Sequence, residues 1–391
     1  MNKPMGFWRV FRTVFKKSIL NRDTFAIFVL AVAGYLIFYA WPYLNQSITD
    51  IPTAVVDLDR SGTSRGLIHS LDATPGARVV LITDNPAEGD HALRTDEAAV
   101  VLTIPADFEK RLAKGENSPL ALVANGAFPV KGRAVHAALA GVVTAPERTI
   151  DNAPVLAGGT PGAVLLKTSY ANPGSIVDYR FNEIGGYANY TVPMVGPVIL
   201  QAVLMMAVTL TIGGWLRSRE NRPPEFEEAL RYPLRRGLAV LLSFWVVGIF
   251  WYLYMEGFDF WLFQFSTMTN PLAVLTVGAL FVLAIVSFAM MVSFIMGSNQ
   301  WTSQAVVMMS APSVFIAGPV WPLNNVDNPV VLLISQLIPS SSGIRAILAV
   351  SQDGAPWTRI AEPCLQLLLL SMGYLLIVWA LVKLRRRRHL R

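Results

Sequence analysis

Residues 272–297 read LAVLTVGALFVLAIVSFAMMVSFIMG, a run of 26 residues without a single Asp, Glu, Lys or Arg. A helix that crosses the hydrocarbon core of a bilayer needs about 20 mainly apolar residues. Because no water reaches that core, the backbone must satisfy its own hydrogen bonds, and this favours an α-helix over the run. The stretch therefore predicts a membrane-spanning helix.

Five further runs of this kind occur elsewhere in the chain. They cover residues 24–42, 191–216, 238–255, 303–320 and 363–382. Hydrophobic residues make up 53% of the 391 residues and charged residues only 15%, against about 25% charged in soluble domains. The sequence therefore predicts a polytopic α-helical membrane protein with six transmembrane helices. The single cysteine, Cys364, excludes an intrachain disulfide.

The basic residues indicate which side of the membrane each loop faces. Six of them precede the first span, six lie between the second and third spans, and six follow the last, while the loop 256–270 has none. By the positive-inside rule both termini of this multi-pass protein are cytoplasmic, including the basic tail 385–391. The net charge of +6 is thus a membrane-flank effect and not evidence for nucleic acid binding. The span 24–42 lacks a small-residue cleavage site and is interpreted as an uncleaved signal anchor.

The segment 43–189 is long and mildly acidic, with 12 basic and 16 acidic residues. Its apolar runs predict four strands, and the intervening segments predict helices. The strands are expected at Pro52–Leu58, Ala77–Thr83, Ala98–Ile104 and Pro119–Asn125, and the helices at 62–72, 86–95, Pro105–Lys114 and 129–145. This predicts a mixed α/β extracytoplasmic domain, followed by a Gly/Pro-rich link at Pro154–Gly162. A five-helix transmembrane region is expected over 190–384.

Residues 329–350 contain two apolar pieces, each too short to span a membrane. Val330–Leu337 and Ile344–Val350 flank Pro339-Ser340-Ser341-Ser342-Gly343. A seventh span here would place the basic tail outside, against the positive-inside rule. A re-entrant or interfacial hairpin on the outer side is therefore expected, with the Pro-Ser-Gly segment as its break.

The sequence lacks the common signatures of catalysis. Asp57-Leu58-Asp59-Arg60-Ser61 begins like a calcium loop, but the twelfth position is Ile68 and not the required Glu. We expect instead a strand that ends in a turn, with Ser61 or Asp59 as a helix N-cap. No P-loop, G-x-S-x-G elbow or HExxH helix occurs.

The six spans also lack charged residues, and Glu256, Asp259 and Glu362 are placed at their edges. Because ion-coupled carriers usually keep such residues inside the bilayer, we expect the energy for transport to come from a partner.

Two cytoplasmic segments are suited to contact that partner. In residues 1–23, Trp8, Phe11 and Phe15 recur at helical spacing against basic residues, which predicts an amphipathic interface helix on the inner leaflet. The loop 217–236 contains a short predicted helix with acidic residues in its first turn, a pattern that suits the helix dipole. In that helix Phe226 and Leu230, at i and i+4, form one apolar spot in a charged rim, although an ordinary solvated loop explains the pattern equally well.

Motifs along nearly the whole chain resemble one family. Ala54-Val55-Val56-Asp57-Leu58-Asp59-Arg60-Ser61 with Ser64-Arg65 is similar to its first outer strand and helix, and Ile104-Pro105-Ala106-Asp107-Phe108 with Gly115 to its "IP-x-x-F … G" step. Tyr170, Asn172, Pro173, Tyr190 and Pro193 resemble the return into the second span. The last outer segment and gate are matched by Pro312, Gly318, Pro319, Pro322, Pro339 and Gly354. The chain resembles the permeases of ABC type-2 exporters, in the branch with a large domain between the first two spans.

The resemblance implies a permease subunit that moves drug-like, lipid-like or similar amphipathic cargo outward and is not itself an enzyme. It implies an ABC ATPase partner, which holds ATP and Mg, and a second permease chain in a homo- or heterodimer; a periplasmic adaptor often accompanies this branch. No cofactor is expected on this chain. The family's coupling role is carried over to Glu220, Glu225 and Glu228, and the expected coupling surface also includes Phe226, Glu227, Leu230 and Arg231. The segment lacks the family's Gly-Thr and has two more residues before Pro233.

Two rival functions follow from the same features. A membrane-anchored receptor or scaffold would bind a ligand or partner through the α/β domain alone, and six spans are more than it needs. A membrane-embedded enzyme acting on lipid would need an intramembrane nucleophile, base or metal set, which the spans lack. An ABC export permease is therefore the favoured interpretation.

Overall fold

The internal contacts divide the chain into two units, Met1–Leu44 with Arg180–Arg391 and Asn45–Tyr179. The structure is a computed structural model. It describes residues 6–20, 22–41, 48–116, 118–124, 129–144, 187–218, 220, 222–263, 270–296, 315–316, 323–352 and 354–389.

The smaller unit is built on a four-stranded sheet with strand order β2-β1-β3-β4. The strands are β1 (Ile51–Asp57), β2 (Ala77–Thr83), β3 (Val100–Ile104) and β4 (Ala121–Ala124). The first three are parallel, with Ala54 opposite both Leu81 and Val101, and β4 is antiparallel to β3. All four strands were predicted from their apolar runs, and the prediction is confirmed.

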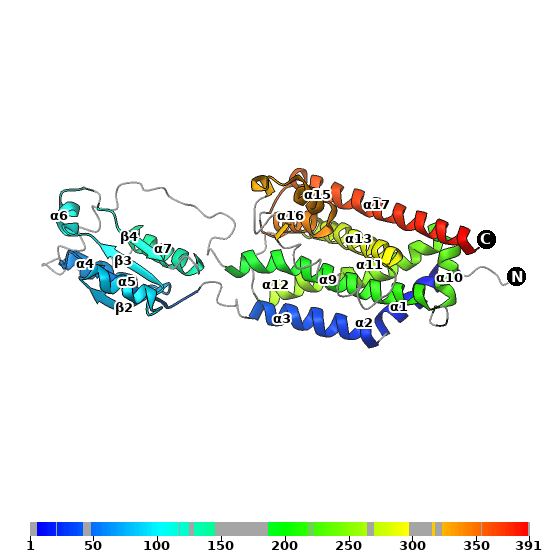
Figure 1. The fold of residues 1–391 in the computed structure, drawn as a ribbon, viewed down its shortest axis with the longest axis horizontal. Helices are drawn as coiled ribbons and strands as arrows, with labels where there is room; N and C mark the ends of the chain where they lie inside the picture. Colours follow the sequence, from blue (N-terminus) through cyan, green and yellow to red (C-terminus); the bar gives the residue numbers. More distant parts are fainter. Residues whose placement is uncertain are drawn as a thin grey trace. The chain divides into compact units, whose positions relative to one another are not determined.

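Helices cover both faces of this sheet, because parallel strands need crossover connections. The helices are α4 (Gly62–Asp72), α5 (Pro86–Arg94), α6 (Phe108–Ala113) and α7 (Pro129–Thr144). Alternate residues of β1 serve the two faces: Val55 packs in the core with α4, α6 and α7, and Val56 packs with α5. The unit thus has two apolar layers of its own, one on each side of the sheet, and Figure 1 shows its helices packed about the strands.

The ends of two helices test predictions about capping. Ser61 caps α4, and its hydroxyl accepts a bond from the Ser64 amide as predicted. Pro105 does not open a helix, and that prediction is wrong: α6 begins at Phe108, after Asp107 in the left-handed region with φ 62°. The Pro154–Gly162 link lies outside the described residues.

The larger unit contains long apolar helices that run side by side (Figure 1). Among the described residues, four helical stretches are long and apolar enough to cross a membrane: Thr191–Arg217, Pro233–Leu262, Pro271–Met296 and Trp357–Arg385. They contain α9 (Tyr187–Arg217), α11 (Leu238–Leu253), α13 (Pro271–Met296) and α17 (Trp357–His389). The stretch before α11 and the one after it, Pro233–Gly237 and Tyr254–Asp259, are π-helical, and α12 (Phe260–Leu262) follows.

The remaining predicted spans are described only in part. The first predicted span, 24–42, is helical in three consecutive pieces: α2 (Arg22–Ala26), π-helical Ile27–Ala33 and α3 (Gly34–Ala40). The predicted span 303–320 lies outside the described residues except for 315–316. Six spans therefore stay a prediction.

The predicted hairpin at 329–350 is a bent helix pair. It consists of α15 (Pro329–Leu337) and α16 (Pro339–Ser351), with a bend of 74° between them, and would raise the number of spans to five if the pair crosses the membrane. The predicted break at residues 339–343 is wrong, because these residues form the buried first turns of α16 and the break is at Ile338. Pro339 occupies the first turn, where a missing amide costs no hydrogen bond.

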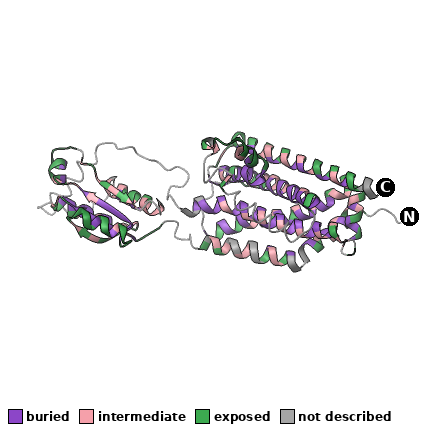
Figure 2. Ribbon diagram, viewed as in Figure 1, coloured by how far each residue is buried: buried purple, intermediate pink, exposed green. Residues whose placement is uncertain are grey.

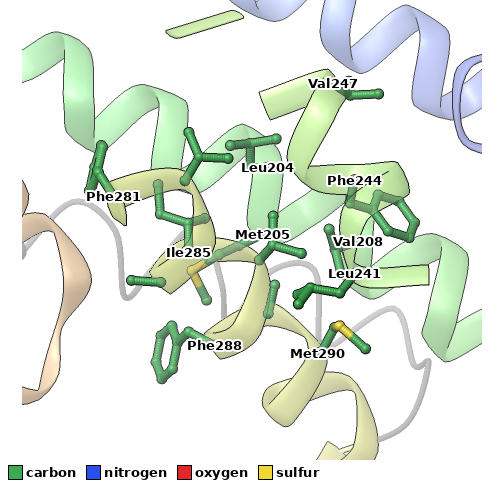
Figure 3. Close-up of a cluster of buried hydrophobic side chains, with 14 of the residues drawn as sticks. Leu204, Met205, Val208, Leu241, Phe244, Val247, Phe281, Ile285, Phe288 and Met290 are labelled. Carbon is green, nitrogen blue, oxygen red and sulfur yellow. The ribbon is translucent and has the colours of Figure 1, made fainter. Parts of the chain in front are cut away.

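The core of the larger unit lies between α9, α11 and α13. Leu204, Val208, Phe244, Phe281 and Ile285 interdigitate there (Figure 3). α17 is packed less completely than α9. In the most apolar part of each helix, 28% of the residues of α17 are buried and 72% of those of α9. Exposed residues accordingly follow one side of α17 (Figure 2).

Two acidic residues thought to lie at a membrane edge are inside the packed unit. Glu256 and Asp259 belong to the helical stretch that continues to Leu262, and they are 7% and 0% exposed. Among the described residues, neither carboxylate oxygen of Asp259 has a hydrogen-bond partner. Both residues lie near the C-terminal end of the stretch Pro233–Leu262, so their position at the edge of a span stays a prediction; Glu362 is exposed and faces Arg345 at 3.7 Å.

Candidate functional site

The predicted coupling helix exists as α10 (Pro224–Arg231), at the end of the larger unit that also contains α1 (Phe7–Leu20) and the C-terminal end of α17 (Figure 1). Pro223 precedes it in an extended conformation, and Pro224 occupies its first turn. Glu225 and Glu227 lie in that turn, where carboxylates favour the positive end of the helix dipole. The same residues that suggested a helix therefore begin it.

The apolar side of α10 faces inward. Phe226 is 2% exposed, and its ring centroid lies 5.1 Å from that of Trp215 in α9. Ala229 is also buried, and Leu230 is half-buried. Phe226 was expected to form an apolar spot for a partner. In the structure it anchors α10 to α9 and has almost no surface to offer.

Two acidic residues of α10 are used within the chain. The Arg9 guanidinium in α1 lies 3.6 Å from the carboxylate of Glu225. Glu228 forms an ion pair with Arg236, whose guanidinium also stacks 4.1 Å from the centroid of the Tyr232 ring. The Glu228–Arg236 pair is largely shielded from water and orients α10 more firmly than an exposed pair would, whereas the Arg9 side chain is exposed.

The outward side of α10 is a narrow charged stripe. Pro224, Glu227 and Arg231, at i, i+3 and i+7, are all exposed, and Glu220 is exposed just before the helix. Of the predicted coupling residues, therefore, Glu220, Glu227 and Arg231 are accessible to a partner, and Glu225, Phe226 and Glu228 hold the helix in place.

One positioning residue was missed by the sequence reasoning. Arg222 donates from Nε to the Trp215 carbonyl at 2.7 Å and from NH2 to the Leu216 carbonyl at 3.2 Å. These carbonyls belong to the last turn of α9, where helix oxygens lack intrahelical partners. An arginine shortly after a helix end is a recognisable signal for such a cap, but here it was counted only as a flanking charge.

Helix α1 packs against the bundle through one face. Val10 and Val14 are fully buried, and the Ser243 hydroxyl of α11 donates to the Phe11 carbonyl at 3.2 Å. Of the three predicted interface residues, Phe11 and Phe15 are half-buried and stacked at 5.8 Å, and Trp8 is 70% exposed. α1 thus combines an inner packing face with an outer surface that carries Trp8 and basic residues.

The predicted outer gate is described at one position only. Pro312, Gly318, Pro319 and Pro322 lie outside the described residues. Pro339 is buried at the start of α16, where the Ser340 amide donates to the side-chain oxygen of Gln201 in α9 at 2.9 Å. This bond ties the bent pair to α9.

These contacts connect α10 to three neighbouring segments. It is tied to α9 through Phe226, to α1 through Glu225, and to the residues before α11 through Glu228. A displacement applied to its exposed stripe would therefore act on three helices together. Within the described ranges no group of three His, Cys, Asp or Glu could hold a metal ion.

Several helices long and apolar enough to span a membrane, a separate α/β unit and a short helix tied to the spans fit a polytopic membrane protein. The chain belongs to the ABC-2 family of transporter proteins, whose pattern matches residues 22–380. It is similar to a probable multidrug ABC transporter permease, YbhR, of Escherichia coli K12, with 21% identity over 326 residues that cover 81% of this chain and 82% of the relative. The protein of the same name from Escherichia coli O157:H7 matches with the same values. Membership of a permease family indicates a transport subunit and not an enzyme.

Proposed function

We propose that this chain is the membrane-spanning subunit of an ATP-driven exporter in the cytoplasmic membrane of a bacterium. ATP and Mg are held by a separate ABC ATPase, and two permease chains, identical or different, form the path for the cargo. The α/β unit lies outside the membrane and both termini lie inside, as the distribution of basic residues favours. The family match and the permease relative support the class.

The observation that carries the proposal is the construction of α10. A helix with a buried anchor, two internal ion pairs and an exposed charged stripe is suited to receive a push from a partner and pass it to α1, α9 and α11. In this proposal the stripe Glu220, Glu227 and Arg231 contacts the ATPase, and Phe226, Glu225 and Glu228 transmit the movement.

Charge reversal of the stripe tests the proposal. The Glu227→Lys and Arg231→Glu double variant is measured in proteoliposomes together with the ATPase. ATP-driven export is expected to fall about fivefold or more, the factor that corresponds to the lower end of typical coupling free energies. Glu116→Lys with Arg111→Glu reverses two exposed charges in the other unit and should leave export unchanged. Unchanged export by the α10 variant, or failure of the purified chain to retain any P-loop ATPase, would count against the proposal.

The proposed cargo is a drug-like, lipid-like or similar amphipathic molecule that leaves the cell, with or without a periplasmic adaptor. The printed name of the relative, a multidrug permease, supports a cargo of this kind. Cells that lack the chain should accumulate more of an amphipathic dye than cells that express it. Equal accumulation across a panel of such dyes would redirect the search to other cargo.

Orientation has its own test. In a Cys364→Ser background, Lys114→Cys in the α/β unit and Arg12→Cys in α1 each place one exposed thiol. A membrane-impermeant maleimide added to spheroplasts should label the first and not the second. Labelling of Arg12→Cys in intact spheroplasts would reverse the proposed topology.

A further inference from the structure

A cavity of about 230 Å³ lies directly under α10. Its walls come from α10, the π-helical Pro233–Gly237, α11, α13 and α17, and every lining residue is apolar or aromatic. Leu230, Leu238, Met290, Phe294, Trp379 and Val382 represent these walls. An apolar cavity of this kind stays dry and favours an apolar occupant.

The cavity reaches the surface of the unit. Leu234, Leu238 and Trp379, all in its lining, are 79%, 46% and 41% exposed. They stand where the spans Pro233–Leu262 and Trp357–Arg385 begin and end, respectively. The ends of membrane-spanning helices lie where lipid headgroups meet acyl chains, so an opening there would be accessible to an acyl chain of the bilayer.

Two cations lie against rings that line the cavity. Lys383 Nζ lies 5.0 Å from the ring centroid of Trp379, and the Arg385 guanidinium lies 5.6 Å from that of Phe294 while NH2 donates to the Phe294 carbonyl at 2.9 Å. Both rings line the cavity. Arg235, next to Leu234, is exposed.

The acidic residues near the opening are few. Glu228 forms its ion pair with Arg236, and Glu225 faces Arg9 in α1. Glu227 lies on the exposed stripe of α10. The cavity therefore has an apolar interior and cations beside it. Glu225 and Glu228 do not neutralise these cations, because each already faces another arginine.

We propose that this cavity binds an anionic phospholipid, with an acyl chain between α10, α13 and α17 and its phosphate near Lys383, Arg385 and Arg235. Basic sites between transmembrane helices recognise such headgroups through the same combination of charge and apolar surface. Phe226, Ala229 and Leu230 of α10 form one wall of the cavity. The bound lipid therefore packs against α10 and stabilises its position. The proposal concerns lipid binding and does not depend on which cargo is exported.

The test is a lipid titration on the full-length chain in detergent, with bound lipid counted by native mass spectrometry. Dioleoyl-phosphatidylglycerol is expected to bind more tightly than dioleoyl-phosphatidylcholine. Arg235→Gln with Lys383→Gln should weaken binding of the anionic lipid about thirtyfold, because two cations near the anionic headgroup are lost and their usual contributions add. Arg12→Gln with Lys17→Gln, two exposed cations of α1, should change it less than about twofold.

Two further variants separate a lost site from a lost fold. Arg235→Lys with Lys383→Arg keeps the charges and should retain the lipid. Leu230→Trp fills the cavity and should lower retention of both lipids while the chain stays monodisperse. Equal binding of the two lipids, or unchanged binding in both the charge-removing and the filling variant, would overturn the proposal. A change of oligomeric state in Leu230→Trp with lipid retention intact would assign the cavity to a second copy and would also overturn it.

Discussion

At the scale of single residues, Phe226 shows how burial decides a role that spacing leaves open. Phe226 and Leu230 at i and i+4 correctly indicated an apolar face on α10. The pattern of one helix does not reveal which neighbour covers that face, and here Trp215 covers it. An apolar position in a charged loop was therefore assigned to a partner, although it belongs to the chain's own core.

Truncation of this anchor is expected to destabilise the larger unit. Phe226→Ala removes a ring that is 2% exposed, and such changes cost about 3–5 kcal/mol. The midpoint of thermal unfolding in detergent should fall accordingly. Glu227→Ala changes the next residue, which belongs to the exposed stripe. It should alter the free energy of unfolding by less than about 0.5 kcal/mol. A similar midpoint for both variants would mean that Phe226 is not an anchor.

Asp259 carries the opposite expectation. It is fully buried and both carboxylate oxygens lack a hydrogen-bond partner, and an unsatisfied buried polar group costs about 1–3 kcal/mol. Asp259→Leu should therefore raise the unfolding midpoint, because the cost of burying the carboxylate disappears and Leu has the same branching at Cγ. Asp327→Leu, at an exposed position before α15, is the control and should leave the midpoint unchanged. A fall in the midpoint of Asp259→Leu would show that the carboxyl has a partner in the assembled protein.

At the scale of elements, long apolar runs were the most reliable signals. The spans that contain α9 and α13 were predicted to within about one residue, and those that contain α11 and α17 were predicted shorter than they are. About 20 apolar residues leave few alternatives to a helix. The bend at 329–351 was predicted, but its position was not. Pro339, three serines and Gly343 look like a loop by composition, yet proline suits the first turn of α16 and glycine allows a close packing contact.

Gly343 provides the test of that packing. A Cβ at this position would overlap the ring of Phe281 in α13, so the two helices approach as closely as small residues permit. Gly343→Ala is expected to destabilise the unit by about 1–3 kcal/mol, the usual cost of overpacking. Gly373→Ala in α17 meets no atom within 4 Å and should be neutral, or stabilising by up to about 1 kcal/mol. Equal unfolding midpoints for the two variants would contradict the close contact.

At the scale of the whole molecule, the sequence predicted local elements better than it predicted contacts between residues far apart in the chain. Apolar runs predicted the four strands that the described residues of the α/β unit form, and charge counts suggested the sides of the membrane. The ion pair Arg9–Glu225 joins residues more than 200 positions apart, and the cavity under α10 is built from five segments. No local pattern encodes such meetings, because they depend on how the helices pack.

The division into two units leads to a final prediction. The unit Asn45–Tyr179 has a four-stranded sheet and two apolar layers formed entirely by its own residues. Expressed alone, this fragment should be soluble and should unfold in one cooperative transition. The transition is measured by circular dichroism as the urea concentration is raised. Leu102→Ala, at a fully buried position in β3, should lower its free energy of unfolding by about 2–5 kcal/mol. Val80→Ala, at an exposed position in β2, is the matched control and should cost less than about 1 kcal/mol. A fragment without a cooperative transition would mean that the α/β unit needs the membrane part in order to fold.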